Sequence, residues 1–147
     1  MKIKRPKASS PEALRRMQVT KQRDTAAELN LRRAVHALGL RFRVDQPILP
    51  GMRRRADLVF LSAKTAVFVD GCFWHCCPIH RTFPKANAKW WVAKLRTNLR
   101  RDENTNEQLR RAGWMVARVW EHEPAAKAAE RIFKIVQRRL RSIQRTR

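Results

Sequence analysis

Residues 56–75 read ADLVFLSAKTAVFVDGCFWH, and they contain two short apolar runs. The runs, residues 56–61 and 65–70, are separated by Ser-Ala-Lys, and each carries one acidic residue, Asp57 or Asp70. Apolar runs of this length, joined by a short turn, are typical of neighbouring buried strands. We therefore expect an antiparallel hairpin in which the two aspartates lie close together.

The regions on both sides of this hairpin predict further elements. Thr25 and Glu28 have the spacing of a capping box, and Gly39 and Gly113 are natural helix stops. We expect a helix over residues 25–38, a strand over 40–44, an irregular loop over 71–86, a helix over 88–112, a strand over 114–120 and a last helix that has Pro124 at its first position. The order α-β-β-β-α-β-α predicts an α/β fold with one mixed sheet flanked by helices.

The composition indicates a polyanionic partner. The 147 residues include 34 Lys and Arg against 12 Asp and Glu, a formal net charge of +22. Solubility alone does not require such an excess, so nucleic acid is the leading candidate, with DNA, ribosomal RNA or an anionic membrane as options. Residues 1–23 are basic with few large apolar side chains, and we expect them to be a flexible arm that orders only on a polyanion.

No apolar run approaches the roughly 20 residues that span a bilayer, so we expect no membrane partner. The basic N-terminus is followed by no apolar segment, so no secretory signal is expected. The three cysteines lie within six residues, which suits a metal cluster in a reducing cytoplasm better than a disulfide framework. A monomer is expected, because the sequence shows no unpaired apolar stripe that a second copy would need to cover.

The carboxylates suggest hydrolysis of a phosphodiester. Such reactions usually need a divalent cation, which prefers carboxylate and carbonyl oxygens. Asp57 follows the run Arg53-Arg54-Arg55, which could neutralise a phosphate, and Asp70 and Glu28 complete a candidate acidic centre. The alternative is that Asp57 caps a turn or pairs with Arg55, as acids at strand ends often do.

The loop that follows Asp70 is dense in metal ligands. Zinc needs four N or S ligands, and the candidates are Cys72, His75, Cys76, Cys77, His80 and the more distant His122. If the last strand lies beside residues 65–70, His122 would complete a Cys2His2 site. His75 is also a candidate general acid or base, because its reference pKa of about 6.5 lies near neutrality. The alternative is free thiols and surface histidines.

Aromatic residues accompany this loop. Phe73 and Trp74 lie beside the proposed centre, and Trp90 and Trp91 open the long helix. Aromatic side chains of this kind can wedge between base pairs, although core packing is their commoner role. Because Trp90 and Trp91 are adjacent, one is expected in the core and the other is freer to meet DNA. Four further aromatics on strands are assigned to the core: Phe60, Phe68, Trp114 and Trp120.

Several of these stretches together resemble the very-short-patch repair (Vsr) endonucleases. The stretches are residues 56–60, residues 67–75 with the specific run Gly-Cys-Phe-Trp-His, residues 91–94, Asn98, Arg101-Asp102, residues 112–114 and Trp120-Glu121. The resemblance covers roughly residues 22–123. It implies a PD-(D/E)xK restriction-endonuclease-like core, with an endonuclease domain over residues 24–123 and an added basic helix over 124–147.

The resemblance also implies an activity, its cofactors and its partners. Vsr enzymes make a magnesium-dependent nick 5′ of the thymine in T:G mismatches, which arise when 5-methylcytosine deaminates. We therefore expect a mismatch endonuclease on double-stranded DNA, linked to a DNA cytosine methyltransferase, in the cytoplasm and nucleoid of a bacterium. The alternatives are a restriction-type or defence-associated nuclease on paired DNA, and a non-catalytic zinc-bearing nucleic-acid-binding module.

Residue by residue, the resemblance implies the following roles. Asp57 and the backbone carbonyl of Val69 bind magnesium, and His75 is catalytic. The intercalating aromatics are Phe73, Trp74 and Trp91, with Lys94 as a further DNA contact; the structural zinc ligands are Cys72, Cys77, His80 and His122.

Three departures from the family pattern stand out. Asp70 and His122 replace a histidine and a cysteine of the best-known members, and only Cys76 separates His75 from Cys77. Asp70 could therefore bind metal or take the place of a catalytic histidine.

Overall fold

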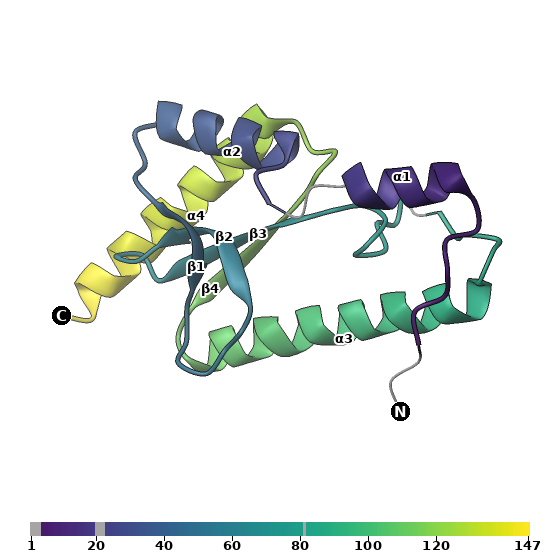
Figure 1. Cartoon of the computed structure of the whole chain (residues 1–147). Coiled ribbons are helices and arrows are strands. Elements are labelled where there is room, and N and C mark those ends of the chain that lie inside the picture. Colours follow the sequence, from purple (N-terminus) through teal and green to yellow (C-terminus); the bar gives the residue numbers. More distant parts are fainter. Residues whose placement is uncertain (1–3, 20–22, 81) are drawn as a thin grey trace.

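The computed structural model describes residues 4–19, 23–80 and 82–147, and shows a four-stranded sheet with helices on both faces (Figure 1). The elements are α1 (Pro11–Val19), α2 (Ala26–Ala37), β1 (Arg43–Pro47), β2 (Arg55–Phe60), β3 (Thr65–Asp70), α3 (Ala88–Arg111), β4 (Met115–Trp120) and α4 (Ala125–Arg145). After α1, this is the predicted order, so the mixed α/β class is confirmed.

The sheet brings the ends of two distant strands together. Its order is β1-β2-β3-β4; the first two pairings are antiparallel and β3 pairs with β4 in parallel. The predicted hairpin is therefore present, with Leu58 opposite Val67, and Asp70 lies opposite Trp120. Because parallel strands end at the same edge, the loops that follow β3 and β4 begin side by side.

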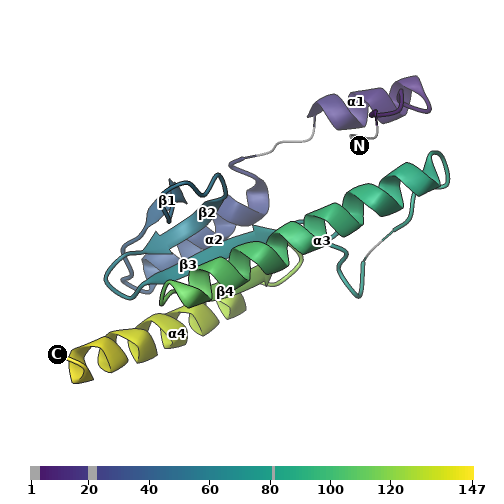
Figure 2. The ribbon, with the colours of Figure 1, turned by 90° about the horizontal axis from the view of Figure 1, so that it is seen from below.

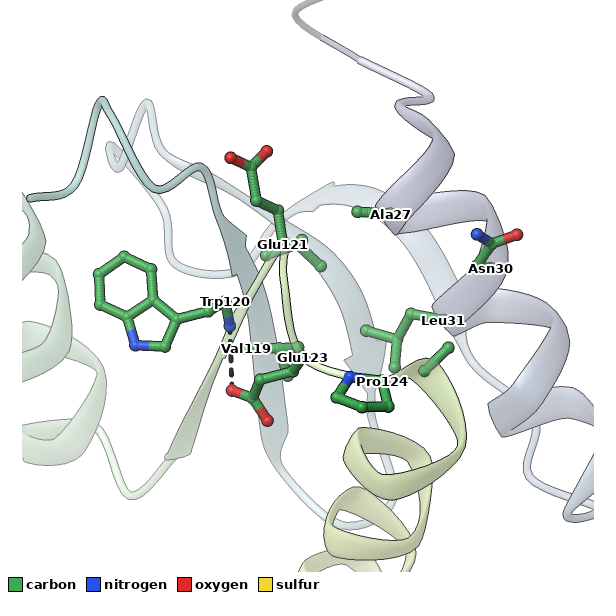
Figure 3. Close-up of a pocket in the computed structure, with 10 residues that line it drawn as sticks. Ala27, Asn30, Leu31, Val119, Trp120, Glu121, Glu123 and Pro124 are labelled. Atoms are coloured by element: carbon green, nitrogen blue, oxygen red, sulfur yellow. Dashed lines mark hydrogen bonds between the residues drawn. The ribbon is translucent and has the colours of Figure 1, made fainter. Parts of the chain in front are cut away.

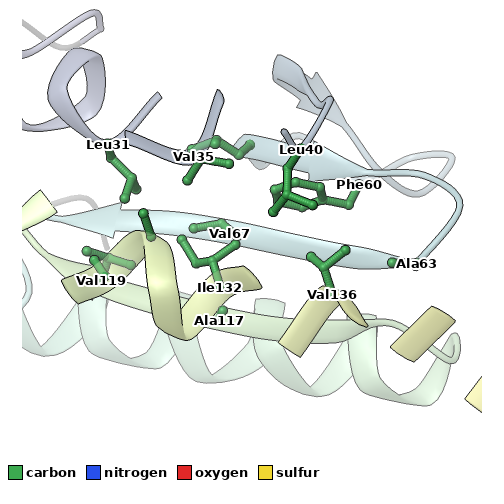
Figure 4. Packing of buried hydrophobic residues seen from close by; sticks show 13 residues of the cluster. Leu31, Val35, Leu40, Phe60, Ala63, Val67, Ala117, Val119, Ile132 and Val136 are labelled. Carbon is green, nitrogen blue, oxygen red and sulfur yellow. The ribbon is translucent and has the colours of Figure 1, made fainter. Parts of the chain in front are cut away.

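One face of the sheet packs against α2 and α4, as Figure 4 shows. The buried positions in α4 are Ala128, Ala129, Ile132 and Val136, which recur at helical spacing. They meet Leu31 and Val35 of α2 and inward-facing residues of β2–β4. Helix α4 is therefore part of the main core of the domain.

The other face of the sheet packs against α3. Its smaller cluster contains Ala56, Val59, Ala66, Phe68 and Leu109, with Trp114 packed against it. Phe60 and Phe68 are buried as predicted. Trp120 is only half-buried, and its ring stacks near His122 at a centroid distance of 6.4 Å.

Helix α1 was not predicted. Ser10 accepts a bond from the Ala13 N–H at 3.1 Å, Pro11 opens the helix and Glu12 lies in its first turn, so local capping accounts for it. The expectation of an arm without structure is therefore wrong for residues 11–19. No residue of α1 is buried, and Figure 2 shows the helix apart from the sheet.

Two boundaries also differ from the sequence prediction. Strand β1 covers Arg43–Pro47 instead of residues 40–44, because Arg55 holds the Asp45 carbonyl and an edge strand tolerates a terminal proline. Pro124 is the residue before α4, not its first residue. None of the helices in the described part of the chain is long and apolar enough to cross a membrane.

Candidate active site and metal centre

An acidic centre lies where α2, β2 and β3 meet. The Asp57 carboxylate accepts a hydrogen bond of 2.6 Å from the Val69 N–H across the hairpin. Burial raises the pKa of Asp57 from 3.8 to about 6; the bond from Val69 opposes this shift, and the charges of Glu28 and Asp70 add to it. The three acids are therefore near enough to interact, as the sequence predicted.

The alternative in which Asp57 pairs with Arg55 is wrong. Arg55 instead binds Asp45, with a nitrogen–oxygen distance of 3.2 Å between the side chains. Among the described residues, Asp57 forms no ion pair. Thr25 caps α2, since its Oγ1 accepts the Glu28 N–H at 3.3 Å, and the Glu28 carboxylate lies 3.5 Å from Arg32. The predicted cap at Thr25 thus starts the helix that carries Glu28, whose charge acts on Asp57.

The predicted basic run does not act as a unit. Arg54 donates to Asp102 at 3.1 Å and Arg55 binds Asp45, so both guanidinium groups have protein partners. Arg53 is exposed.

His75 lies in a network of carboxylates and arginines. Its Nδ1 is 2.5 Å from Asp102 and 3.7 Å from Asp70. Arg118 lies 2.8 Å from Asp70 and 3.6 Å from Asp102. Burial raises the pKa of Asp70 in spite of Arg118, whereas His75 and the arginines hold the pKa of Asp102 below its ordinary value against the effect of burial. His75 is thus joined to a carboxylate, not to the cysteines.

Asp102 and Arg118 were missed as site residues. A signal for Asp102 was present, because Leu95, Asp102 and Leu109 share one face of α3 at seven-residue spacing and all three are buried. An acid on the apolar stripe of a basic helix needs a partner. Arg118 had only the weaker signal of a charge inside an apolar strand.

A second cluster lies just beyond the strand ends. Within the described residues, the donor atoms of Cys72, Cys77, His80 and His122 all lie within 4.8 Å of one another. Cys72 Sγ is 3.1 Å and Cys77 Sγ 3.7 Å from His122 Nδ1, and Cys77 Sγ is 3.9 Å from His80 Nδ1. Neighbouring S and N ligands of tetrahedral zinc lie roughly 3.5 Å apart, so the set fits such an ion.

The parallel pairing of β3 and β4 creates this cluster. Cys72 follows β3 and His122 follows β4, and the Glu121 carboxylate accepts the Cys72 N–H at 2.9 Å. Cys76 has φ 54° and lies outside the cluster. The arrangement therefore suits a Cys/His metal centre, and the fold brings together four of the six candidate ligands.

The three aromatic residues predicted to intercalate gather in one place. The Phe73 ring lies 5.1 Å from Trp74 and 5.3 Å from Trp91, and Trp74 lies 5.8 Å from Trp91. Asn98 ties the loop to α3 by donating to the Trp74 carbonyl at 3.2 Å. Trp90 and Trp91 are both half-buried and pack on each other. Neither belongs to the core clusters, so the expectation that one of them lies in the core is wrong.

A cavity of about 240 Å³ lies between α2, the end of β4 and the start of α4 (Figure 3). Asn30, Val69, Glu121 and Glu123 are among its lining residues, and Glu123 accepts the Trp120 N–H at 3.0 Å. Neither Asp57 nor His75 lines it. The cavity therefore adjoins Val69, whose N–H binds Asp57, but does not contain the two candidate catalytic side chains.

The chain is similar in sequence to known DNA endonucleases. The sequence model of a family described as DNA mismatch endonuclease Vsr matches residues 10–81. The type II nicking enzyme V.NaeI of Lentzea aerocolonigenes is 46% identical over 111 residues, which cover 74% of this chain and 67% of that one.

Two further relatives are similar over comparable lengths. The type II nicking enzyme V.XorIIP of Xanthomonas oryzae pv. oryzae is 38% identical over 117 residues, 78% of this chain and 83% of its own. The DNA mismatch endonuclease Vsr of Escherichia coli is 36% identical over 107 residues, 71% of this chain and 66% of its own.

Proposed function

The chain belongs to the Vsr family of DNA mismatch endonucleases, and from this premise we propose that it nicks duplex DNA at T:G mismatches. The cut would fall 5′ of the thymine, by magnesium-dependent hydrolysis on a PD-(D/E)xK-type core. The observation that carries the proposal is that Asp70 interacts both with Asp57 and with His75 of the His75–Asp102 pair. Asp70 links the two, because it lies 3.7 Å from His75 and its charge raises the pKa of Asp57.

The donor set at Asp57 suits a hard cation. Asp57 is half-buried, forms no ion pair within the described residues, and has Glu28 and the Val69 backbone beside it. We assign the magnesium contacts to the Asp57 carboxylate and the Val69 carbonyl, with Glu28 as a nearby acid. Magnesium bound there would neutralise charge on the phosphate and acidify the attacking water.

We assign proton transfer to His75. Because Asp102 engages Nδ1, the opposite nitrogen, Nε2, is left to accept a proton from the attacking water or return one to the leaving oxygen. Asp102 holds the ring in this orientation, and it stays ionised because its pKa is lowered. Asp70 stays beside the centre as a buried charge bound to Arg118.

We assign DNA opening to Phe73, Trp74 and Trp91. Trp74 is the most exposed of the three, at 38%; Phe73 packs against it edge to face, and Trp91 packs against it at a tilt of 55°. Aromatic wedges unstack a base step, and a mismatched step costs less to open than a paired one. Lys94 lies one turn beyond Trp91 on α3, and with Arg53 it would hold the adjacent phosphates.

We assign zinc to the Cys72–Cys77–His80–His122 cluster. Two buried cysteines and two exposed histidines leave no open position, so the role of the ion would be structural. It would hold the loop that carries Phe73, Trp74 and His75. Because T:G mismatches arise from deaminated 5-methylcytosine, we further propose a functional link to a DNA cytosine methyltransferase.

The test is a nicking assay with magnesium on end-labelled duplexes that carry T:G, T:A or C:G in varied contexts. Wild type is compared with Asp57→Asn and with a matched control, Asp45→Asn, an acid on β1 that binds Arg55. We expect wild type and Asp45→Asn to cut only the T strand of T:G, and Asp57→Asn to be inactive. Cutting of paired DNA would favour a restriction-type role, and binding without cleavage by wild type would refute both enzymatic proposals.

A further inference from the structure

Arg118 is a charged residue on the face of β4 that should be apolar. Ala117 and Val119 face the core formed with α2 and α4, so Arg118 points to the other face, under α3. There its guanidinium lies 4.5 Å from the centre of the Phe68 ring. A cation in such a place is destabilising unless it is paired and hydrogen-bonded, so its partners explain why it is tolerated.

Two separate sets of contacts hold the guanidinium. On one side, Nε and Nη2 both donate to the Asn106 side-chain oxygen, at 3.0 and 2.9 Å. On the other side, Nη1 donates to Asp70 at 2.8 Å and lies 3.6 Å from Asp102. Asn106 therefore fixes the plane of the fork, and the fork aims Nη1 at Asp70.

His75 faces two carboxylates with one nitrogen. Its Nδ1 lies 2.5 Å from Asp102 and 3.7 Å from Asp70. A neutral imidazole has one N–H, which one acceptor can engage well. If Asp70 had no other donor, it would compete with Asp102 for this N–H and draw the ring out of its present orientation.

We propose that Arg118 is a positioning residue for the nicking reaction: it engages Asp70, so that Asp102 alone orients His75. This rests on the proposed role of His75 as the proton-transfer group. The proposal also explains how an aspartate is accommodated at position 70, because a carboxylate beside the histidine needs a cation of its own, and Arg118 is that cation. Lysine could supply the charge but not the planar fork that Asn106 and Asp70 share.

The first test is a double-mutant cycle under single-turnover conditions on the T:G duplex. We expect Arg118→Met to slow nicking about 10- to 100-fold, the range for residues that orient a site ligand. The double variant Arg118→Met/Asp70→Asn should nick faster than Arg118→Met, because the competing carboxylate is gone. Arg118→Lys, which keeps the charge, should fall between wild type and Arg118→Met.

A matched control separates positioning from stability. Arg139 is also a fold-spanning arginine, but it donates to the carbonyls of Ala63 and Gly113, far from His75. Arg139→Met should lower the melting temperature without slowing the single-turnover step. If the losses of Arg118→Met and Asp70→Asn simply multiply in the double variant, Arg118 is not arbitrating between the two acids and the proposal is wrong.

The second test reads the histidine directly. In ¹⁵N-histidine-labelled protein, the His75 Nδ1–H bound to Asp102 should give a downfield proton resonance, assigned by its loss in His75→Gln. We expect it to be lost or shifted in Arg118→Met and restored by adding Asp70→Asn. An unchanged resonance in folded Arg118→Met would overturn the inference even if wild type nicks DNA; if wild type does not nick at all, the proposed function itself fails.

Discussion

Asp57 is a half-buried carboxyl group whose proposed role in the reaction works against the stability of the fold. Its pKa is raised to about 6 by burial, so the folded protein holds this proton more tightly than the unfolded chain does. Stability therefore falls as the pH rises from about 4 to about 6, and stays lower above that range. The ionised form, which a cation needs, is the form that the fold disfavours.

The substitution Asp57→Asn should separate these two effects. Asparagine can still accept the Val69 N–H but carries no charge, so we expect the variant to be more stable than wild type at pH 7–8 by on the order of 1–3 kcal/mol. The difference should disappear near pH 4, as measured by urea unfolding without divalent metal. Wild-type nicking should fall as the pH drops through about 6.

Addition of magnesium provides the complementary measurement. It should raise the melting temperature of wild type at pH 7.5 and leave that of Asp57→Asn unchanged, because a ligand stabilises only a protein that binds it. If magnesium raised the melting temperatures of wild type and Asp57→Asn equally, the cation would bind at a site other than Asp57.

At the level of single residues, the sequence predicted what a short motif carries. Asp57, Cys72 and Cys77 stand in or beside the run at residues 56–75, and the structure brings them to the expected surroundings. Asp102 and Arg118 could not be assigned in this way, because their partners are distant in the sequence. Asp102 binds His75, 27 residues away, and Arg118 binds Asp70, 48 residues away.

At the level of elements, the parallel neighbours β3 and β4 and the loops that follow them produce the Cys/His cluster. Capping and stop signals predicted α2 and the end of α3 well, since these depend on local chemistry. Strand β1 was misplaced because its position depends on pairing with β2, and Pro47 looked like a turn residue. Helix α1 was missed because no buried stripe marks it.

The loop between β3 and α3 should depend on its metal. We expect Cys77→Ser, or removal of the metal by a chelator, to lower the melting temperature by more than about 5 °C and nicking at least about tenfold. The fluorescence of the loop tryptophan Trp74 and its neighbour Trp91 should shift as their packing loosens.

Cys76→Ser is the matched control for this prediction. Its thiol lies outside the cluster, so metal content and nicking should match wild type. Metal analysis of purified protein checks both variants; a full equivalent of zinc in Cys77→Ser would contradict the assigned ligand set.

At the scale of the whole molecule, charge is spread well beyond the site. The net charge is +22, and residues 1–19 hold six of the 34 Lys and Arg residues. Helix α1 buries none of its residues, so the fold gains little from it. We therefore expect this basic segment to contact DNA.

Deletion of residues 1–19 should therefore weaken DNA binding without lowering the melting temperature. Each lost phosphate contact should reduce the slope of log K against log salt by about 0.9, so we expect a fall of up to roughly 5 units. Fluorescence anisotropy at several salt concentrations measures this slope. Replacing the six basic residues by glutamine should reproduce the deletion; a large drop in melting temperature would show that α1 supports the fold.

The pairing of Cys72 with His122, which are 50 residues apart in the chain, has a consequence for biosynthesis. The acids, the histidine and the metal cluster are collected from Glu28 to His122, and α4 closes the core after that. At about 5–20 residues per second, the ribosome needs several seconds to make the stretch between the two metal ligands. A nascent or prematurely terminated chain thus lacks the assembled Asp57–Asp70–His75 centre and the Cys/His cluster, and such a fragment should not cut DNA.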